Sequence, residues 1–214
     1  MFQPEKIDFT KTKTFSARDR HNLVRIDNMA VPGQEKGPLF TSPEFDVLVE
    51  KLKKARDEKR TITCFIGAHV IKCGLSRYLI WLMENGYITH LASNGAGSIH
   101  DFELAYLGGT SEHVPTAIED GSFGMWEETG RWMNEAIREG DAHGYGYGQS
   151  LAAYIDAHPE RFPNKQDCVF YRAFQMGVPM TYHVTIGTDI IHQHPYADFG
   201  AIGRTSGVDF AYFC

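Results

Sequence analysis

Residues Ser93 to Glu103 combine a glycine-rich turn with ionisable side chains, an arrangement suited to holding a small ligand. An apolar run over residues 88–92 precedes them, and apolar residues recur afterwards, so the order predicts strand, tight turn and helix. The start of a helix offers unpaired N–H groups and the positive end of its dipole to an anion. His100, Asp101 and Glu103 add ionisable groups to the first turn. The stretch predicts a ligand-binding turn, although glycines also suit turns that only connect two elements.

Two other strand-like runs end in small or polar residues. The run over residues 61–66 leads into Gly67, Ala68 and His69, and the run over residues 179–186 leads into Gly187, Thr188 and Asp189. A helix over residues 74–84 separates the first two strands, which predicts a βαβ unit. Ligands of open parallel sheets bind at the carboxyl ends of the strands. We therefore expect the three turns to surround one cleft, although Asp189 would also serve as a helix cap.

The remaining patterns predict the elements around this cleft. Residues 1–40 read as an N-terminal arm, and residues 41–214 as one α/β domain. Ser42 and Pro43 begin a helix as N-cap and first residue, and amphipathic or apolar patterns predict helices over residues 125–139, 149–157 and 165–176. Alternating glycines over residues 140–148 predict a loop, either a mobile flap or an oligomer contact. A helix that begins near Ser206, a few residues before the last residue, suggests a truncated domain.

Composition limits the function classes. The chain has 214 residues, 43% hydrophobic and 22% charged, with a net charge of −6, which disfavours nucleic acid as a partner. No apolar run reaches the roughly 18 residues of a membrane span, and the first residues lack the order of a signal peptide. The four cysteines form no paired motif. We therefore expect a cytoplasmic protein without disulfides.

A metal-dependent hydrolase is one alternative hypothesis, since His183, His192 and His194 lie close together in sequence. On a strand, two residues two positions apart share a face, as in many zinc sites. The chain contains no HExxH motif to support this. We therefore predict no metal site, and the hydrolase remains the weaker hypothesis.

Three segments, taken in order, resemble the deoxyhypusine synthase family, and specifically its bacterial deoxyhypusine-synthase-like branch. They are FIGAHVIKCGL at residues 65–75, SNGAGSIHDFE at residues 93–103 and IGTDIIH at residues 186–192. The resemblance extends from about residue 40 onward. It implies a Rossmann-like parallel sheet flanked by helices, a homotetramer, NAD as cofactor and a polyamine substrate such as spermidine. Members of the family transfer an aminobutyl group from the polyamine to an acceptor amine through a lysine imine.

The resemblance also assigns roles to individual residues. It implies cofactor binding by two turns and the following histidine: Gly67, Ala68, His69, Ser93, Asn94, Gly95, Ala96, Gly97 and His100. It implies substrate binding by Asp101, Asp189 and His192. His100 and His192 stand where eukaryotic members carry acidic residues, so an imidazole replaces a carboxylate at both positions.

The chain also departs from the family. The family's second glycine-rich cofactor loop and its catalytic lysine belong to a C-terminal third that this sequence does not contain. Lys72 is the only lysine beside a candidate site, and it matches no imine-forming position. The resemblance therefore leaves the catalytic residues unknown. A non-catalytic module for oligomerisation or ligand binding is the other alternative hypothesis.

Overall fold

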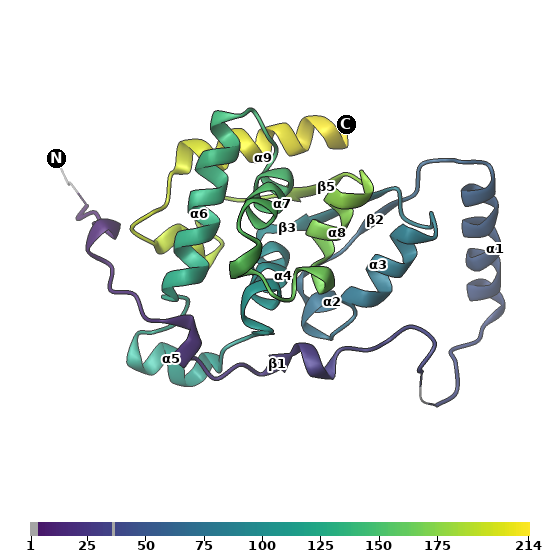
Figure 1. The fold of residues 1–214 in the computed structure, drawn as a ribbon, viewed down its shortest axis with the longest axis horizontal. Coiled ribbons are helices and arrows are strands. Elements are labelled where there is room, and N and C mark those ends of the chain that lie inside the picture. The colour runs from purple at the N-terminus through teal and green to yellow at the C-terminus, as the bar shows by residue number, and fades with distance from the viewer. Residues whose placement is uncertain (1–3, 36) are drawn as a thin grey trace.

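The computed structural model describes residues 4–35 and 37–214. At its centre lies a parallel three-stranded sheet in the order β2-β3-β5, with helices around it (Figure 1). The strands are β2 (Thr63–Phe65), β3 (His90–Asn94) and β5 (Met180–His183). Leu91 of β3 pairs with Cys64 on one side and with Met180 on the other. The predicted mixed α/β architecture, with a parallel sheet flanked by helices, is therefore confirmed.

Several helices of the described part connect and cover these strands, whereas the helix over residues 43–57 has no buried residue and lies to one side (Figure 1). The helices of this part are α1 (Pro43–Asp57), α2 (Ala68–Lys72), α3 (Ser76–Glu84), α4 (Gly95–Leu107), α5 (Val114–Asp120), α6 (Glu127–Ala142), α7 (Tyr147–Ala157), α8 (Val169–Met176) and α9 (Phe199–Phe213). The described part also contains short 3-10 helices at residues 9–11, 17–19, 26–28, 159–161, 165–167 and 190–193. Helix α1 begins as predicted, because the Ser42 hydroxyl accepts the N–H of Phe45 at 3.1 Å. The helix predicted over residues 165–176 is divided at Cys168 into a 3-10 turn and α8.

The sheet presents two different faces, because successive side chains of a strand point to opposite sides. Leu91 and Tyr182 share one face and are fully buried. Rings of α4 and α8 complete that side of the core, where Phe102 and Phe170 stack with centroids 6.5 Å apart. On the opposite face, His183 of β5 contacts Phe213 near the end of α9, with ring centroids 5.1 Å apart. Most of the apolar core therefore lies on the α4 and α8 side of the sheet.

Helix α9 corrects the prediction of a helix that begins near Ser206. It begins at Phe199, and the Asp198 carboxylate caps it by accepting the N–H of Ala201 at 3.0 Å. Ser206 lies inside the helix, and its Oγ donates to the carbonyl of Tyr182 at 3.2 Å. The prediction was wrong because Ser206 binds the edge of the sheet and caps nothing.

The glycine-rich segment 140–148 was also predicted wrongly as a loop, since α6 runs to Ala142 and α7 begins at Tyr147. A Cβ on Gly140 would lie 1.8 Å from Oγ of Ser150, and a Cβ on Gly148 would lie 2.1 Å from the carbonyl oxygen of Met180. These glycines therefore allow α6, α7 and β5 to pack closely. Only residues 143–146 remain between the two helices.

The N-terminal arm packs along the rest of the molecule (Figure 1). Its strand β1 (Val24–Arg25) pairs antiparallel with β4 (Gly109–Thr110). Nearer the N-terminus, the N–H of Phe15 donates to the carbonyl of Met125 at 2.8 Å. Ala17 and Arg20 are buried, so the arm contributes to the interior. In the part of the chain that the structure describes, no helix has the length and apolar character needed to cross a bilayer.

Candidate functional site

A cavity of about 270 Å³ lies beside the start of α4 and the turn that follows β5. Most of the ionisable side chains that line it come from α2, α4, the segment after β4 and the arm. The lining consists of Arg20, Lys72, Ala96, Ile99, His100, Glu103, Ser111, Glu112, Val114, Phe123, Thr188, Asp189 and Ile190. The cavity is therefore at the carboxyl edge of the parallel strands, where α/β proteins bind ligands.

The first turn of α4 is capped from within the protein. The Asn94 side chain accepts the N–H of Gly97 at 3.0 Å. A Cβ on Gly95 would lie 1.9 Å from Oδ2 of Asp189, and a Cβ on Gly97 would lie 2.4 Å from Oγ of Ser93. The glycines are thus needed for contacts inside the molecule. A carboxylate of the protein itself lies at the helix start, where the positive end of the dipole favours negative charge.

Asp189 combines burial with an unsatisfied oxygen. Its carboxylate accepts the N–H of His192 in a capping box, while Oδ2 is buried and has no hydrogen-bond partner among the residues that the structure describes. Burial raises the pKa of this carboxyl to about 6, because the charged form loses solvation. A buried group in a cleft with a perturbed pKa is a functional-site candidate.

His192 holds the turn after β5 through hydrogen bonds to its backbone. Its Nδ1 accepts the N–H groups of Gly187 at 3.0 Å and of Asp189 at 3.3 Å, so we assign the neutral imidazole's proton to Nε2. The ring is buried outside the cavity lining, and burial lowers its pKa. The structure therefore gives His192 a role in positioning Asp189.

A buried polar network forms the wall between the arm and α4. Arg20 donates from two nitrogens to the two oxygens of Glu103, each at 2.8 Å. Thr110 and Thr129 also donate to Glu103, at 2.6 and 2.9 Å. Burial pushes the pKa of Glu103 upward, but Arg20 and these hydrogen bonds outweigh it and hold the pKa below the usual value.

His100 extends this network toward the cavity. Its Nδ1 lies 2.7 Å from Oγ1 of Thr110. Burial is the main cause that lowers the pKa of His100 to about 4; Glu103 opposes the shift, whereas Lys72 and Arg20 add to it. At neutral pH the imidazole is therefore uncharged.

The segment after β4 supplies a second carboxylate and a hydroxyl. Glu112 accepts the N–H of Gly124 at 3.1 Å and the indole N–H of Trp126 at 2.9 Å. Burial raises its pKa, opposed chiefly by the bond from Trp126. Ser111 has a left-handed backbone with φ of 64°, which is uncommon for a residue other than glycine. Within the described ranges 4–35 and 37–214, its buried Oγ has no hydrogen-bond partner.

The structure brings together only part of the set expected from sequence. Ala96, His100 and Asp189 line the cavity, and so does Lys72. The other residues of the α4 start, Ser93, Asn94, Gly95 and Gly97, shape the turn without being part of the lining. Gly67 and His69 are exposed and Ala68 is partly exposed at the start of α2; these three also lie outside the lining.

Asp101 lies elsewhere. It is fully buried, and its carboxylate accepts the N–H groups of Val169 and Phe170, each at 3.0 Å. It therefore caps α8, and Cys168 donates to the same carboxylate. Because hydrogen bonds to α8 occupy this buried carboxylate, we leave Asp101 out of the candidate site.

Sequence reasoning named Glu103 in the predicted ligand-binding turn without giving it a role, and it did not assign Arg20, Ser111 or Glu112 to the site. Glu103 had a detectable signal, because Ala96, His100 and Glu103 share one face of a helix at spacings of four and three residues. Arg20 had no detectable signal in the sequence, because its partner Glu103 lies 83 positions away.

Each of the three histidines of the metal hypothesis makes a hydrogen-bond contact within the protein. Among the described residues, no group of three or more His, Cys, Asp or Glu side chains is placed to hold a metal ion. His194 lies 3.0 Å from the carbonyl of Gly124 through Nε2, and His183 lies 3.2 Å from the Thr181 hydroxyl. Both therefore make structural contacts.

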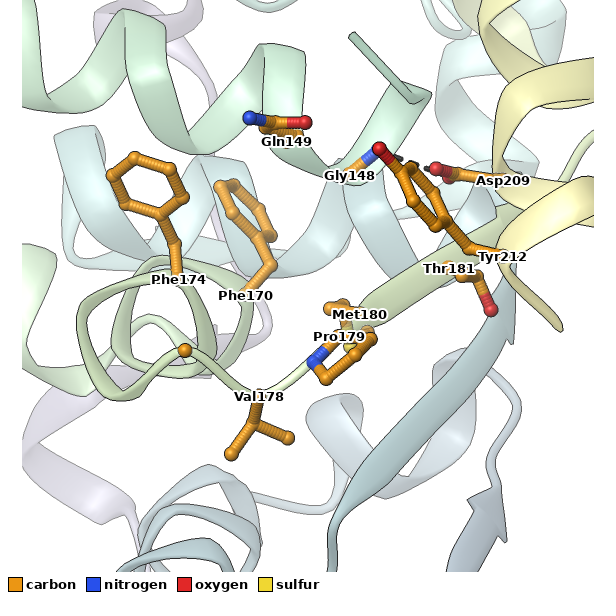
Figure 2. A pocket seen from close by; sticks show the side chains of 11 residues that line it. Gly148, Gln149, Phe170, Phe174, Val178, Pro179, Met180, Thr181, Asp209 and Tyr212 are labelled. Atoms are coloured by element: carbon orange, nitrogen blue, oxygen red, sulfur yellow. Dashed lines mark hydrogen bonds between the residues drawn. The ribbon is translucent and has the colours of Figure 1, made fainter.

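A second cavity, of about 200 Å³, lies between α7, α8, α9 and the start of β5 (Figure 2). Phe170, Phe174 and Val178 provide much of its apolar wall. Its carboxylate, Asp209, already accepts the N–H of Gly148 at 3.1 Å and that of Tyr182 at 2.7 Å. This cavity offers fewer groups for chemistry than the one beside α4.

No protein-family model matches the chain, and no curated protein sequence matches it. Among solved structures, the chain is similar to apo ArgZ, an arginine dihydrolase from the ornithine–ammonia cycle in cyanobacteria. The sequence identity is 17% and the TM-score 0.47, over 79% of this chain and 22% of ArgZ. The chain thus spans about a fifth of that protein, and a match this weak carries no argument about family or activity.

Proposed function

We propose that this protein binds a small amine in the cavity beside α4, as part of NAD-dependent aminobutyl transfer of the deoxyhypusine synthase kind. The observation that supports amine binding is the buried, incompletely paired carboxylate of Asp189. A buried carboxylate without a partner is costly. An ammonium group would supply the missing hydrogen bond and the opposite charge.

The size of the cavity agrees with a small ligand. Its volume of about 270 Å³ lies just below the roughly 300–1,000 Å³ of pockets for drug-sized molecules. A diamine or the end of a polyamine is slender and would fit. A whole dinucleotide would extend beyond it.

The start of α4 does not fit a phosphate group as its side chains lie. Asp189 covers Gly95, and Asn94 occupies the N–H of Gly97. Two anions at one helix start would repel each other. The expectation of NAD binding therefore depends on the resemblance of the three motifs, whereas the proposed amine binding does not depend on NAD.

Calorimetry with putrescine and spermidine, with and without NAD, tests the proposal. We expect the wild-type protein to bind at least one of these amines, and Asp189→Asn to lose most of that affinity. The matched control is Asp198→Asn, because Asp198 is another N-cap carboxylate outside the cavity. Failure of the wild type to bind either amine would refute binding of a simple polyamine, and no effect of NAD on amine binding would refute the NAD-dependent part.

A further inference from the structure

The charges that line the cavity do not match a simple diamine. Arg20 and Glu103 form a buried ion pair, so their charges compensate each other. His100 is neutral at physiological pH, since its pKa is about 4. The ionisable groups left to a ligand are the carboxylates of Asp189 and Glu112 and the ammonium of Lys72.

Lys72 is the group that a diamine leaves without a partner. It is half-buried at the end of α2, and it forms no ion pair within the described part of the chain. An ammonium on the wall of a small cavity repels a second cation there and attracts an anion. A purely cationic ligand would therefore meet opposition from Lys72.

Two polar side chains of the lining with buried, unsatisfied oxygens favour a polar ligand in this cavity. Asp189 is 7% exposed and Ser111 is 6% exposed, and in the described part of the chain each has a buried oxygen without a hydrogen-bond partner. Both side chains belong to the cavity lining. Buried polar atoms in native proteins are nearly always paired, and strained backbone such as that of Ser111 clusters at functional sites.

We infer that the ligand is a basic amino acid of the diamino type, a diamine that also bears a carboxylate. Its two ammonium groups match Asp189 and Glu112, and its carboxylate matches Lys72. The Ser111 hydroxyl is free to donate to that carboxylate or to accept from an ammonium group. This inference rests on the proposed amine-binding function and makes it specific, with Lys72 as the residue that selects for a carboxylate.

A pair of ligands that differ only in the carboxylate tests this inference. Putrescine and ornithine share the same four-carbon diamine, and ornithine adds the carboxylate. By calorimetry on the full chain at pH 7.5, we expect ornithine to bind about tenfold or more tightly than putrescine, which corresponds to about 1.4 kcal/mol. Cadaverine and lysine form a second pair with one more carbon.

Lys72→Met identifies the residue responsible. We expect this variant to lose the preference for ornithine, because the carboxylate no longer meets a cation, and to bind putrescine at least as well as before. The matched control is Lys54→Met, since Lys54 is exposed on α1 outside the cavity. The wild-type comparison needs no variant, so the test does not depend on the folding of Lys72→Met.

The outcomes separate this inference from the proposed function. If putrescine binds through Asp189 and ornithine binds no more tightly, the amino-acid inference is wrong and amine binding stands. A preference for ornithine that survives in Lys72→Met would also overturn it. If the wild type binds none of the four ligands, both proposals fail.

Discussion

Asp189 is the side chain of the candidate site that is best placed to bind a ligand. Its carboxylate caps the turn after β5 and lies over Gly95, and one of its oxygens has no partner in the part of the chain that the structure describes. Burial of a charge without a full set of partners destabilises the folded state. Such a destabilising group is found in binding sites because a bound ligand can supply the missing partner.

Asp189→Asn should therefore stabilise the protein at neutral pH. The folded-state pKa of about 6 is higher than the unfolded value. This carboxyl therefore costs stability increasingly as pH rises from about 4 through 6, and the full cost remains above that range. We expect a gain of about 1–3 kcal/mol at pH 7.5, measured by urea unfolding, and little gain at pH 4. A loss of stability at pH 7.5 would contradict this, whereas the gain should accompany weaker amine binding.

At the scale of elements, the close approach of α4 and the turn after β5 builds the framework of the site, while α9 packs against β5. Gly95 allows the turn after β5 to lie against the first residue of α4. Side chains of α9 accept hydrogen bonds from backbone N–H groups at the free edge of β5. Asp209 accepts the N–H of Tyr182, and Ser206 accepts that of Val184. An edge strand left bare is open to pairing with other chains.

Gly95→Ala should disturb the site more than the fold. The new Cβ would lie 1.9 Å from Oδ2 of Asp189, so the carboxylate must move. We expect a loss of about 1–3 kcal/mol and a clear fall in amine affinity. Gly203→Ala is the control, because its Cβ position in α9 has no described atom within 4 Å apart from its chain neighbours and the backbone of its own helix, and alanine favours helix by about 0.5–1 kcal/mol. Equal effects of both changes on amine binding would refute this account.

Asp209→Ala should weaken the contact between α9 and β5. It leaves the N–H groups of Gly148 and Tyr182 without an acceptor, and each unsatisfied buried group costs about 1–3 kcal/mol. The burial that raises the pKa of Asp209 to about 7 offsets part of this cost. We expect a net loss of about 1–3 kcal/mol in thermal or urea unfolding. Asp209→Asn keeps an acceptor and should lose less; a larger loss in Asn than in Ala would refute the role.

At the scale of the whole molecule, the arm and the α/β body form one folded unit around Glu103. Strand β1 pairs with β4, and Arg20 reaches the interior to meet Glu103 of α4. The side chain of Glu103 is 1% exposed, so its charge depends on this partner from the arm. Residues of the arm therefore contribute both to stability and to the wall of the cavity.

Arg20→Ala should destabilise the whole chain strongly. Removing one partner of a buried ion pair leaves the other charge uncompensated, which costs about 3–5 kcal/mol. Urea unfolding at pH 7.5 measures this loss, and Arg18→Ala is the control because Arg18 is exposed two residues away. If both variants were equally stable, the arm would not be part of the folded core.

Local sequence determined the elements whose signals lie within a few residues. Ser42 and Pro43 set the start of α1, and the apolar runs with their polar ends located β2, β3 and β5, because caps and periodicity act through neighbours in sequence. Tertiary structure alone decided the composition of the site. It placed Asp101 beneath α8, 68 positions away, while the neighbouring His100 faces the cavity. It also brought Arg20 to Glu103 and laid Asp189 over Gly95. These outcomes depend on packing between distant segments, which no local pattern encodes.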